Sequence, residues 1–216
     1  VIFNFNLLTD TFTKKFDFDF ENGVISYGTF MQASNGKLYA TLAQGGASDF
    51  GTLFEYDLDT DNFTKKFNFS EAEKGRTPFG SLIKSENGKF YGLTSVGGTN
   101  NMGVLFEFDP IENTLIKKAD FNGINGSKPF GSLIQASNSK LYGMTREGGV
   151  NNLGVIFEFD TKTDALNKKI DFNGLNGSNP FGNLIQATNS KLYGMTSSGG
   201  ELGGGSLFEY NPINNN

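Results

Sequence analysis

The chain has 216 residues, no cysteine, no histidine and a net charge of −5. The missing side chains exclude disulfides, zinc sites built on cysteine or histidine, and every catalytic triad that uses histidine. The acidic balance argues against nucleic-acid binding, and no apolar run is long enough for a transmembrane helix, which argues against membrane insertion.

The predicted elements are all strands. The chain opens with a short strand at residues 2–6 (IFNFN) and a lysine-containing strand at residues 12–18. A hairpin follows at residues 28–42, where Asn-Gly between two apolar runs is a strong turn signal. The next strand is LFEYD at residues 53–57, and a turn rich in Asp and Thr leads to a second lysine strand at residues 63–69. No stretch keeps the 3.6-residue apolar spacing of a helix.

This series of elements repeats along the whole chain. The hairpin phrase begins at Gly28, Gly80, Gly131 and Gly182, so successive copies start 52, 51 and 51 residues apart. Four antiparallel strands in about 50 residues are the pattern of a β-propeller blade. A β-trefoil has three repeats and does not fit, whereas an extended β array remains an alternative. We expect one β-propeller domain over residues 1–216, with repeats at 1–27 (partial), 28–78, 79–129, 130–180 and 181–216 (partial).

The number of blades is open at this point. The strand of the LFEYD type occurs five times and the other strands four times, so four blades' worth is present. In a closed four-bladed ring, residues 12–18 would complete the last blade at residues 181–210. Such a ring would leave residues 2–5 as a surplus strand. We therefore favour part of a larger propeller.

The repeated phrases resemble a known family. PFGSLIQA, SKLYGMT, the Gly-Gly loop and NNLGVIFEFD, all within residues 129–160, resemble the GloVer-type tandem repeat of bacterial choice-of-anchor proteins. The resemblance covers almost the whole chain. It implies a bacterial protein that is exported and held at the cell surface, and it supplies no catalytic residues to transfer.

Candidate binding residues lie in the loops. The loop after the second strand and the loop that leads to the next repeat, with its Pro-Phe-Gly turn, should share one face, because antiparallel strands alternate in direction. These loops vary most between copies, and variable loops on a rigid scaffold often carry binding. Their Gly and Asn residues also suit left-handed turns, which is the alternative interpretation. The candidate ligand-binding residues are Asn100, Asn101, Arg146, Glu147, Asn151 and Asn152.

Other recurring residues favour structural roles. Glu55 and Lys65 lie ten residues apart across a turn, as do their counterparts in later copies, and we expect a cross-strand ion pair between them. The second lysine, Lys66, would discourage pairing of sheet edges. The tyrosine of the second hairpin strand, for example Tyr39, is expected to be buried between blades rather than to form a platform for sugars.

The acidic turns are a second kind of candidate site, for a cation. Asp57, Asp59 and Asp61 alternate in one turn, and Asp160 and Asp164 lie in another. Alternating oxygen ligands suit Ca²⁺, but these turns lack the glycine and distal glutamate of an EF-hand. Asx-turn hydrogen bonding explains them, and we expect no cofactor and no metal.

The sequence therefore predicts a non-catalytic binding or scaffold module, extracellular or at the cell surface, with a protein or glycan partner. One alternative is a carbohydrate-active enzyme, which needs two carboxylates about 5–10 Å apart; the break in the repeat at Arg146–Glu147 is its only support. The other alternative is a structural subunit of a larger surface assembly. No residue is predicted to be catalytic.

Overall fold

The computed structural model describes residues 1–70 and 72–214, and it confirms an all-β chain. Three antiparallel sheets have the same order, in which each strand is hydrogen-bonded to the next in sequence. We call these sheets blades 1 to 3. Blade 1 contains β3 (Met31–Gln32), β4 (Leu38–Leu42), β5 (Thr52–Asp57) and β6 (Asn62–Asn68); blade 2 contains β7 (Ile83–Lys84), β8 (Phe90–Thr94), β9 (Val104–Asp109) and β10 (Thr114–Asp120); blade 3 contains β11 (Ile134–Gln135), β12 (Leu141–Thr145), β13 (Val155–Asp160) and β14 (Ala165–Asp171).

The first and last sheets differ from these three. β1 (Ile2–Asn6) and β2 (Thr11–Phe16) form a two-stranded sheet, the N-terminal hairpin. In the last sheet, blade 4, β17 pairs with each of the other three strands; these are β15 (Ser178–Pro180), β16 (Ile185–Gln186), β17 (Leu192–Ser198) and β18 (Leu207–Tyr210). A short 3-10 helix, η1 (Ala72–Lys74), precedes β7. Among the residues described, no helix has the length and apolar character needed to cross a membrane.

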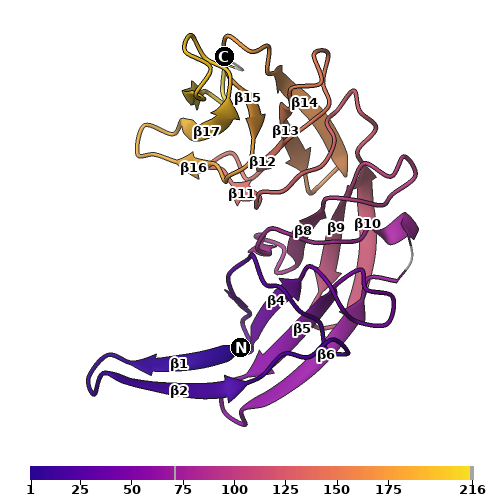
Figure 1. The fold of residues 1–216 in the computed structure, drawn as a ribbon, viewed down its shortest axis with the longest axis vertical. Coiled ribbons are helices and arrows are strands. Elements are labelled where there is room, and N and C mark those ends of the chain that lie inside the picture. The colour runs from indigo at the N-terminus through magenta and orange to yellow at the C-terminus, as the bar shows by residue number, and fades with distance from the viewer. Residues whose placement is uncertain (71, 215–216) are drawn as a thin grey trace.

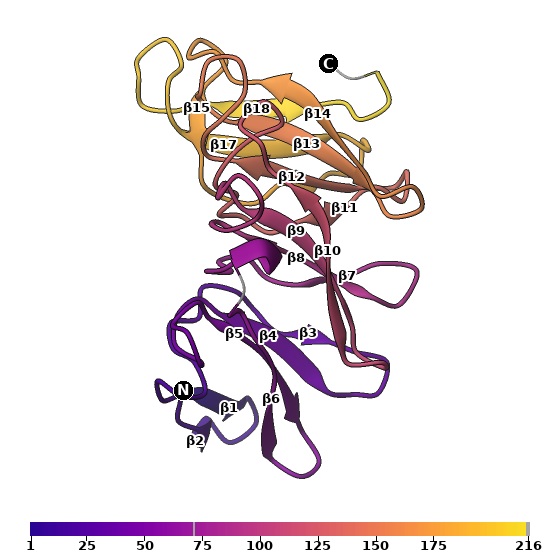
Figure 2. The ribbon, with the colours of Figure 1, turned by 90° about the vertical axis from the view of Figure 1, so that its right-hand side faces the viewer.

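The N-terminal hairpin and the four blades follow one another along an open arc (Figure 1). The hairpin lies at one end and blade 4 at the other, and a quarter turn of the molecule shows the same order (Figure 2). β2 pairs with β1, and β18 pairs with β17. A closed four-bladed ring would place β2 beside β18. The ring in which residues 12–18 complete the last blade is therefore not the arrangement observed.

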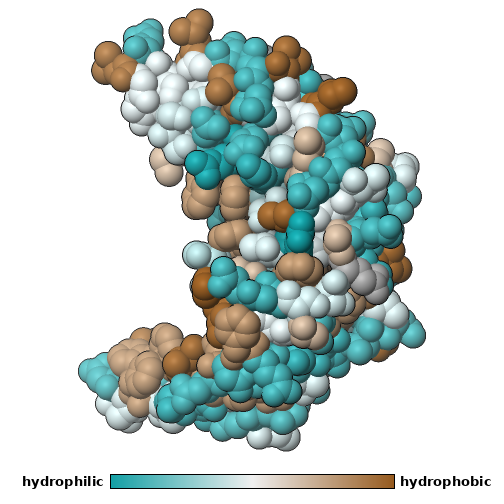
Figure 3. All heavy atoms as spheres, turned by 45° about the vertical axis from the view of Figure 1, so that its right-hand side comes forward, coloured by the Kyte–Doolittle hydropathy of each residue, from teal (hydrophilic) through white to brown (hydrophobic). Residues whose placement is uncertain are grey.

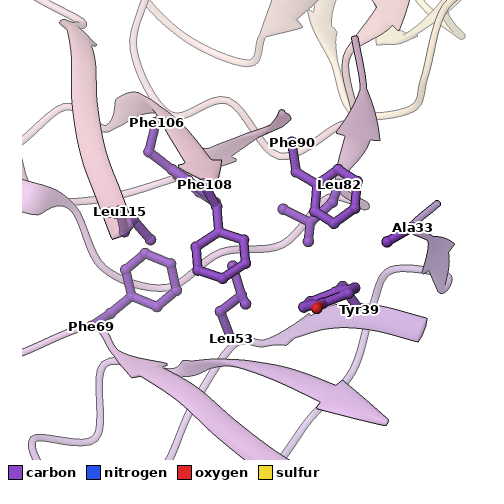
Figure 4. Close-up of a cluster of buried hydrophobic side chains, with 9 residues drawn as sticks. All are labelled: Ala33, Tyr39, Leu53, Phe69, Leu82, Phe90, Phe106, Phe108 and Leu115. Atoms are coloured by element: carbon purple, nitrogen blue, oxygen red, sulfur yellow. The ribbon is translucent and has the colours of Figure 1, made fainter. Parts of the chain in front are cut away.

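Most of the core lies between successive blades. Tyr39 and Leu53 of blade 1 pack against Phe90, Phe106 and Phe108 of blade 2 (Figure 4). Because an internal blade is covered on both faces, its second and third strands are buried at almost every position, the glutamate of the third strand included. The tyrosines of β4, β8 and β12 are fully buried, which confirms their predicted place in the core.

The predicted pairing of Glu55 with Lys65 is wrong. The β5–β6 turn closes one residue earlier than we assumed, so Glu55 lies opposite Thr64. A shift of one residue turns a side chain to the other face of the sheet. Glu55 therefore lies 3.7 Å from Lys66, the second lysine, and 2.9 Å from Lys37 of the β3–β4 hairpin. The second lysine belongs to an ion-pair network and is not a free charge on a sheet edge.

Candidate binding surface at the inner side of the arc

A row of aromatic rings crosses the blades. Each ring precedes one of the two-residue strands β3, β7, β11 and β16, and three of the four rings belong to Pro-Phe-Gly turns. The centroids of successive rings are 4.6, 4.8 and 5.3 Å apart. The first ring is 62 % exposed and the last 54 %, while the middle two are half-buried. We call this set the aromatic row: Tyr27, Phe79, Phe130 and Phe181.

The row lies on the inner side of the arc. Beside the row, the backbones of successive blades approach each other closely. At Gly131, an added Cβ would lie 2.3 Å from the carbonyl oxygen of Gly182, and at Gly80 it would lie 2.4 Å from that of Gly131. Glycine is needed at these two positions because the neighbouring backbone leaves no space for a side chain. The hollowed side of the molecule is visible in the space-filling view (Figure 3).

Polar groups run beside the rings. The backbone N–H of Thr29 donates to Oγ of Ser81 at 2.8 Å, and the N–H of Ser81 donates to Oγ of Ser132 at 2.9 Å. The N–H of Ser132 donates to Oδ1 of Asn183 at 2.6 Å. These residues and the aromatic row line a hollow of about 260 Å³. The surface therefore combines apolar ring edges with hydroxyl and amide groups, repeated blade by blade.

Arg146, a candidate from the sequence, lies at the blade 4 end of the row. Its guanidinium is 5.9 Å from the ring centroids of both Phe130 and Phe181, which is within the range of a cation–π contact. The amide of Asn179 donates to the carbonyl of Arg146 at 3.1 Å and fixes the backbone there. The structure thus brings one predicted site residue to the aromatic row.

Glu147 is held in an ion pair. One carboxylate oxygen lies 2.9 Å from Nζ of Lys128, and the backbone of Glu147 bridges to that of Ser127. The two residues that break the repeat, Arg146 and Glu147, therefore have different roles. The arginine contacts the rings, and the glutamate joins its loop to the preceding one.

The four predicted asparagines shape their own loops. Asn101 and Asn152 adopt positive φ angles of 56° and 55°, and their Oδ1 atoms accept from backbone N–H groups four residues earlier. Asn100 and Asn151 donate to backbone carbonyls 21 residues later, at 3.2 and 3.0 Å. These contacts fit the alternative interpretation that asparagine serves the turns. A contact of these amides with a ligand stays a prediction.

Each blade contains a carboxylate held by tyrosine and lysine. In blade 2, Glu107 accepts from Tyr91 at 2.6 Å and from Lys89 at 2.8 Å, and Lys118 lies 3.7 Å away. Burial by itself raises the pKa of Glu107, but the hydrogen bonds from Lys89 and Tyr91 outweigh it and hold this pKa below its ordinary value. Burial and the hydrogen bond to Glu107 raise the pKa of Tyr91. The glutamate is thus ionised, paired and part of the blade.

The acidic turns are also internally bonded. Oδ1 of Asp57 accepts from the N–H groups of Asp59 and Thr60, which is the expected Asx turn. Asp61 contacts Lys15 at 2.7 Å, and the hydrogen bond from Lys15 is the main reason that its pKa is lowered. No group of three or more acidic side chains in the described ranges is placed to hold a metal ion. Calcium binding in these turns stays untested.

The aromatic row was not predicted as a unit. The Pro-Phe-Gly turns were placed on the loop-bearing face, but nothing in one sequence shows that successive turns meet. The available signal was the phase of the repeat, which puts an aromatic residue before glycine in four copies, at residues 27, 79, 130 and 181.

Similar folds occur in several solved structures. One is the extracellular domain of a protein described as a one-component system from B. thetaiotaomicron, with a TM-score of 0.61 and 14% identity; the match covers 97% of this chain and 25% of that one. TolB from Acinetobacter baumannii has a TM-score of 0.59 and 15% identity, covering 98% and 46%. A chain of a nidogen/laminin complex has a TM-score of 0.60 and 12% identity, covering 88% and 61%.

These propeller-like proteins share the fold of the chain, which spans from a quarter to about three fifths of their lengths. Among curated protein sequences, none matches this chain. The family model of the Gloeobacter/Verrucomicrobia repeat matches residues 72–216, and the chain belongs to this repeat family.

Proposed function

We propose that the chain is a non-catalytic binding module, extracellular or at the cell surface, and that the aromatic row holds a glycan or protein partner. The observation that carries the proposal is the row itself: four rings from four repeats lie side by side in a hollow, with an arginine against two of them. Most other rings of blades 1 to 3 are buried between blades.

The chemistry of the row suits recognition. Aromatic side chains supply large, stiff contact surfaces at a low cost in conformational entropy, and they are enriched where partners bind. The hydroxyl and amide groups beside the rings give hydrogen bonds that orient a ligand. Arg146 adds a charged, planar donor group. Adjacent blades offer the same set of groups, so the surface suits an extended ligand with a repeating backbone.

The contacts of the carboxylates also fit a binding role better than a catalytic one. The recurring glutamates of the blades are engaged by tyrosine and lysine, and Glu147 is paired with Lys128. A glycoside hydrolase would need one raised and one ordinary carboxyl group facing a cleft. The extracellular placement is supported by the resemblance to the anchored repeat family and by one fold relative that is an extracellular domain.

Phe181→Ala should weaken binding about tenfold or more, because an exposed ring that packs on a ligand is a typical hot spot. We would titrate the chain with soluble laminarin, xylan and polygalacturonate by calorimetry, and probe an immobilised peptide library for the protein alternative. Ile111→Ala is the matched control, since Ile111 is 86 % exposed in the β9–β10 turn, away from the row. Equal affinity of the two variants would remove the row from the proposal.

The enzyme alternative has its own test. Release of reducing sugar from the same polysaccharides, abolished by Glu147→Gln and not by Ile111→Ala, would replace the binding role with a catalytic one.

A further inference from the structure

Arg146 brings a positive charge to the aromatic row. Its guanidinium lies against the rings of Phe130 and Phe181, yet in the ranges that the structure describes it has no hydrogen-bond or ion-pair partner. The neighbouring carboxylate of Glu147 is already paired with Lys128 at 2.9 Å and does not neutralise it. The N–H donors of the guanidinium, five in all, are therefore available to a ligand.

The hollow along the row suits a negatively charged ligand. None of the described residues that line it is acidic, although the chain as a whole carries a net charge of −5. Oγ of Ser132, one of these lining residues, accepts from the N–H of Ser81 at 2.9 Å, so its own hydrogen is left to donate. An anionic group thus meets donors on Ser132 and Arg146 and no repelling carboxylate in the lining.

The step of the row fits sugar rings better than peptide residues. Successive aromatic rings lie 4.6 to 5.3 Å apart, and the hydroxyls of Ser81 and Ser132 beside them recur blade by blade with the same backbone contact. An extended peptide presents side chains to one face about every 7 Å, which is twice its rise of about 3.4 Å per residue. In an extended polysaccharide, one sugar ring and its linkage advance the chain by a distance close to one step of the row. The spacing therefore favours a glycan over a peptide.

We propose that the aromatic row binds a linear polysaccharide of uronic acids, with a sugar carboxylate paired to Arg146. The inference rests on the binding role proposed above and specifies its ligand. The planar fork of an arginine matches both oxygens of a carboxylate, and such charged, two-point hydrogen bonds are among the strong ones. The C–H groups of the sugars would contact the rings of Phe79 and Phe130, and Ser132 would donate to a sugar oxygen.

Calorimetry with polygalacturonate and with its fully methyl-esterified form tests the proposal on the unaltered chain. The ester keeps the sugar backbone and removes every carboxylate charge, so it should bind at least about tenfold more weakly. Arg146→Gln should lose about tenfold in affinity for polygalacturonate and keep its affinity for the ester. Lys162→Gln is the matched control and should bind like the unaltered chain. It removes the same charge from an exposed side chain in the β13–β14 turn, outside the lining of the hollow.

The results that would overturn the proposal are distinct from those that would overturn the binding role. Equal affinity for the acid and the ester, with both weakened by Phe181→Ala, would exclude an acidic ligand and keep the row as a binding surface. Equal effects of Arg146→Gln and Lys162→Gln would remove Arg146 as the partner of the carboxylate. Tighter binding of polyglutamate than of polygalacturonate would replace the glycan with an acidic protein segment. Absence of polygalacturonate binding would also overturn the proposal, and if laminarin and xylan fail to bind as well, the glycan-binding role falls with it.

Discussion

At the scale of single residues, the same three groups, a glutamate, a tyrosine and a lysine, recur in each blade with different burial. Glu107 of blade 2 is 5 % exposed at its side chain, whereas Glu209 of blade 4 is 42 % exposed, although both accept from a tyrosine and a lysine. Water screens the exposed pair and competes for its hydrogen bonds, so identical contacts contribute differently to stability. The position of a blade in the arc thus decides what its charge network contributes.

Glu107→Gln should lower the free energy of unfolding by about 1–3 kcal/mol, because it removes the buried charge that Tyr91, Lys89 and Lys118 engage. Glu209→Gln, the matched exposed position, should cost clearly less, because water screens its charge. Urea unfolding followed by circular dichroism measures both. Equal losses would mean that burial does not govern these networks.

The tyrosines of these networks predict a loss of stability at high pH. Burial and the hydrogen bond to Glu55 raise the pKa of Tyr39 to about 12, from an ordinary value of 10.0. The folded state therefore favours the neutral phenol. The corresponding stability is complete below pH 10 and is lost as the pH rises towards 12. The melting temperature should fall as the pH rises across this range, and it should fall less steeply in Tyr39→Phe. An equally steep fall in the variant would show that Tyr39 is not the cause of the pH dependence.

At the scale of elements, successive blades approach each other so closely in front of β7 and β11 that glycine is required at Gly80 and Gly131. Gly131→Ala should destabilise the chain by about 1–3 kcal/mol, because the new methyl group meets the carbonyl of Gly182. Gly182→Ala is the matched control, since no atom lies within 4 Å of an added Cβ there. Thermal unfolding compares the two; similar melting temperatures would show that the blades can separate at the axis at little cost.

Sequence reasoning worked at this scale where the signal was local. The Asn-Gly turn at residues 35–36 predicted the β3–β4 hairpin, and Gly36 adopts the positive φ of 82° that such a turn needs. It failed where one residue of register mattered. The β5–β6 turn is one residue tighter than assumed, so Lys66 and not Lys65 is the lysine that lies near Glu55. It also missed the aromatic row, because the approach of residues 51 apart depends on how blades converge and not on neighbouring residues.

At the scale of the whole molecule, the period of the repeat predicted the blades but not their closure. Blade content follows from the sequence because each strand is short, apolar and bounded by turns. Closure depends on the angle between blades, which the period of the repeat does not reveal. The burial pattern shows the difference: β12 is buried throughout, whereas β17 alternates between buried and exposed positions, since only one of its faces is covered.

The aromatic row is built from one ring per repeat, and this ties the length of the surface to the number of repeats. Duplication or loss of a unit of about 51 residues would lengthen or shorten the row by one ring, with a step of 4.6 to 5.3 Å, while every junction between blades kept its chemistry. Recombination between neighbouring repeats in the gene therefore offers a direct route to surfaces that match longer or shorter ligands. No new type of contact between blades is needed.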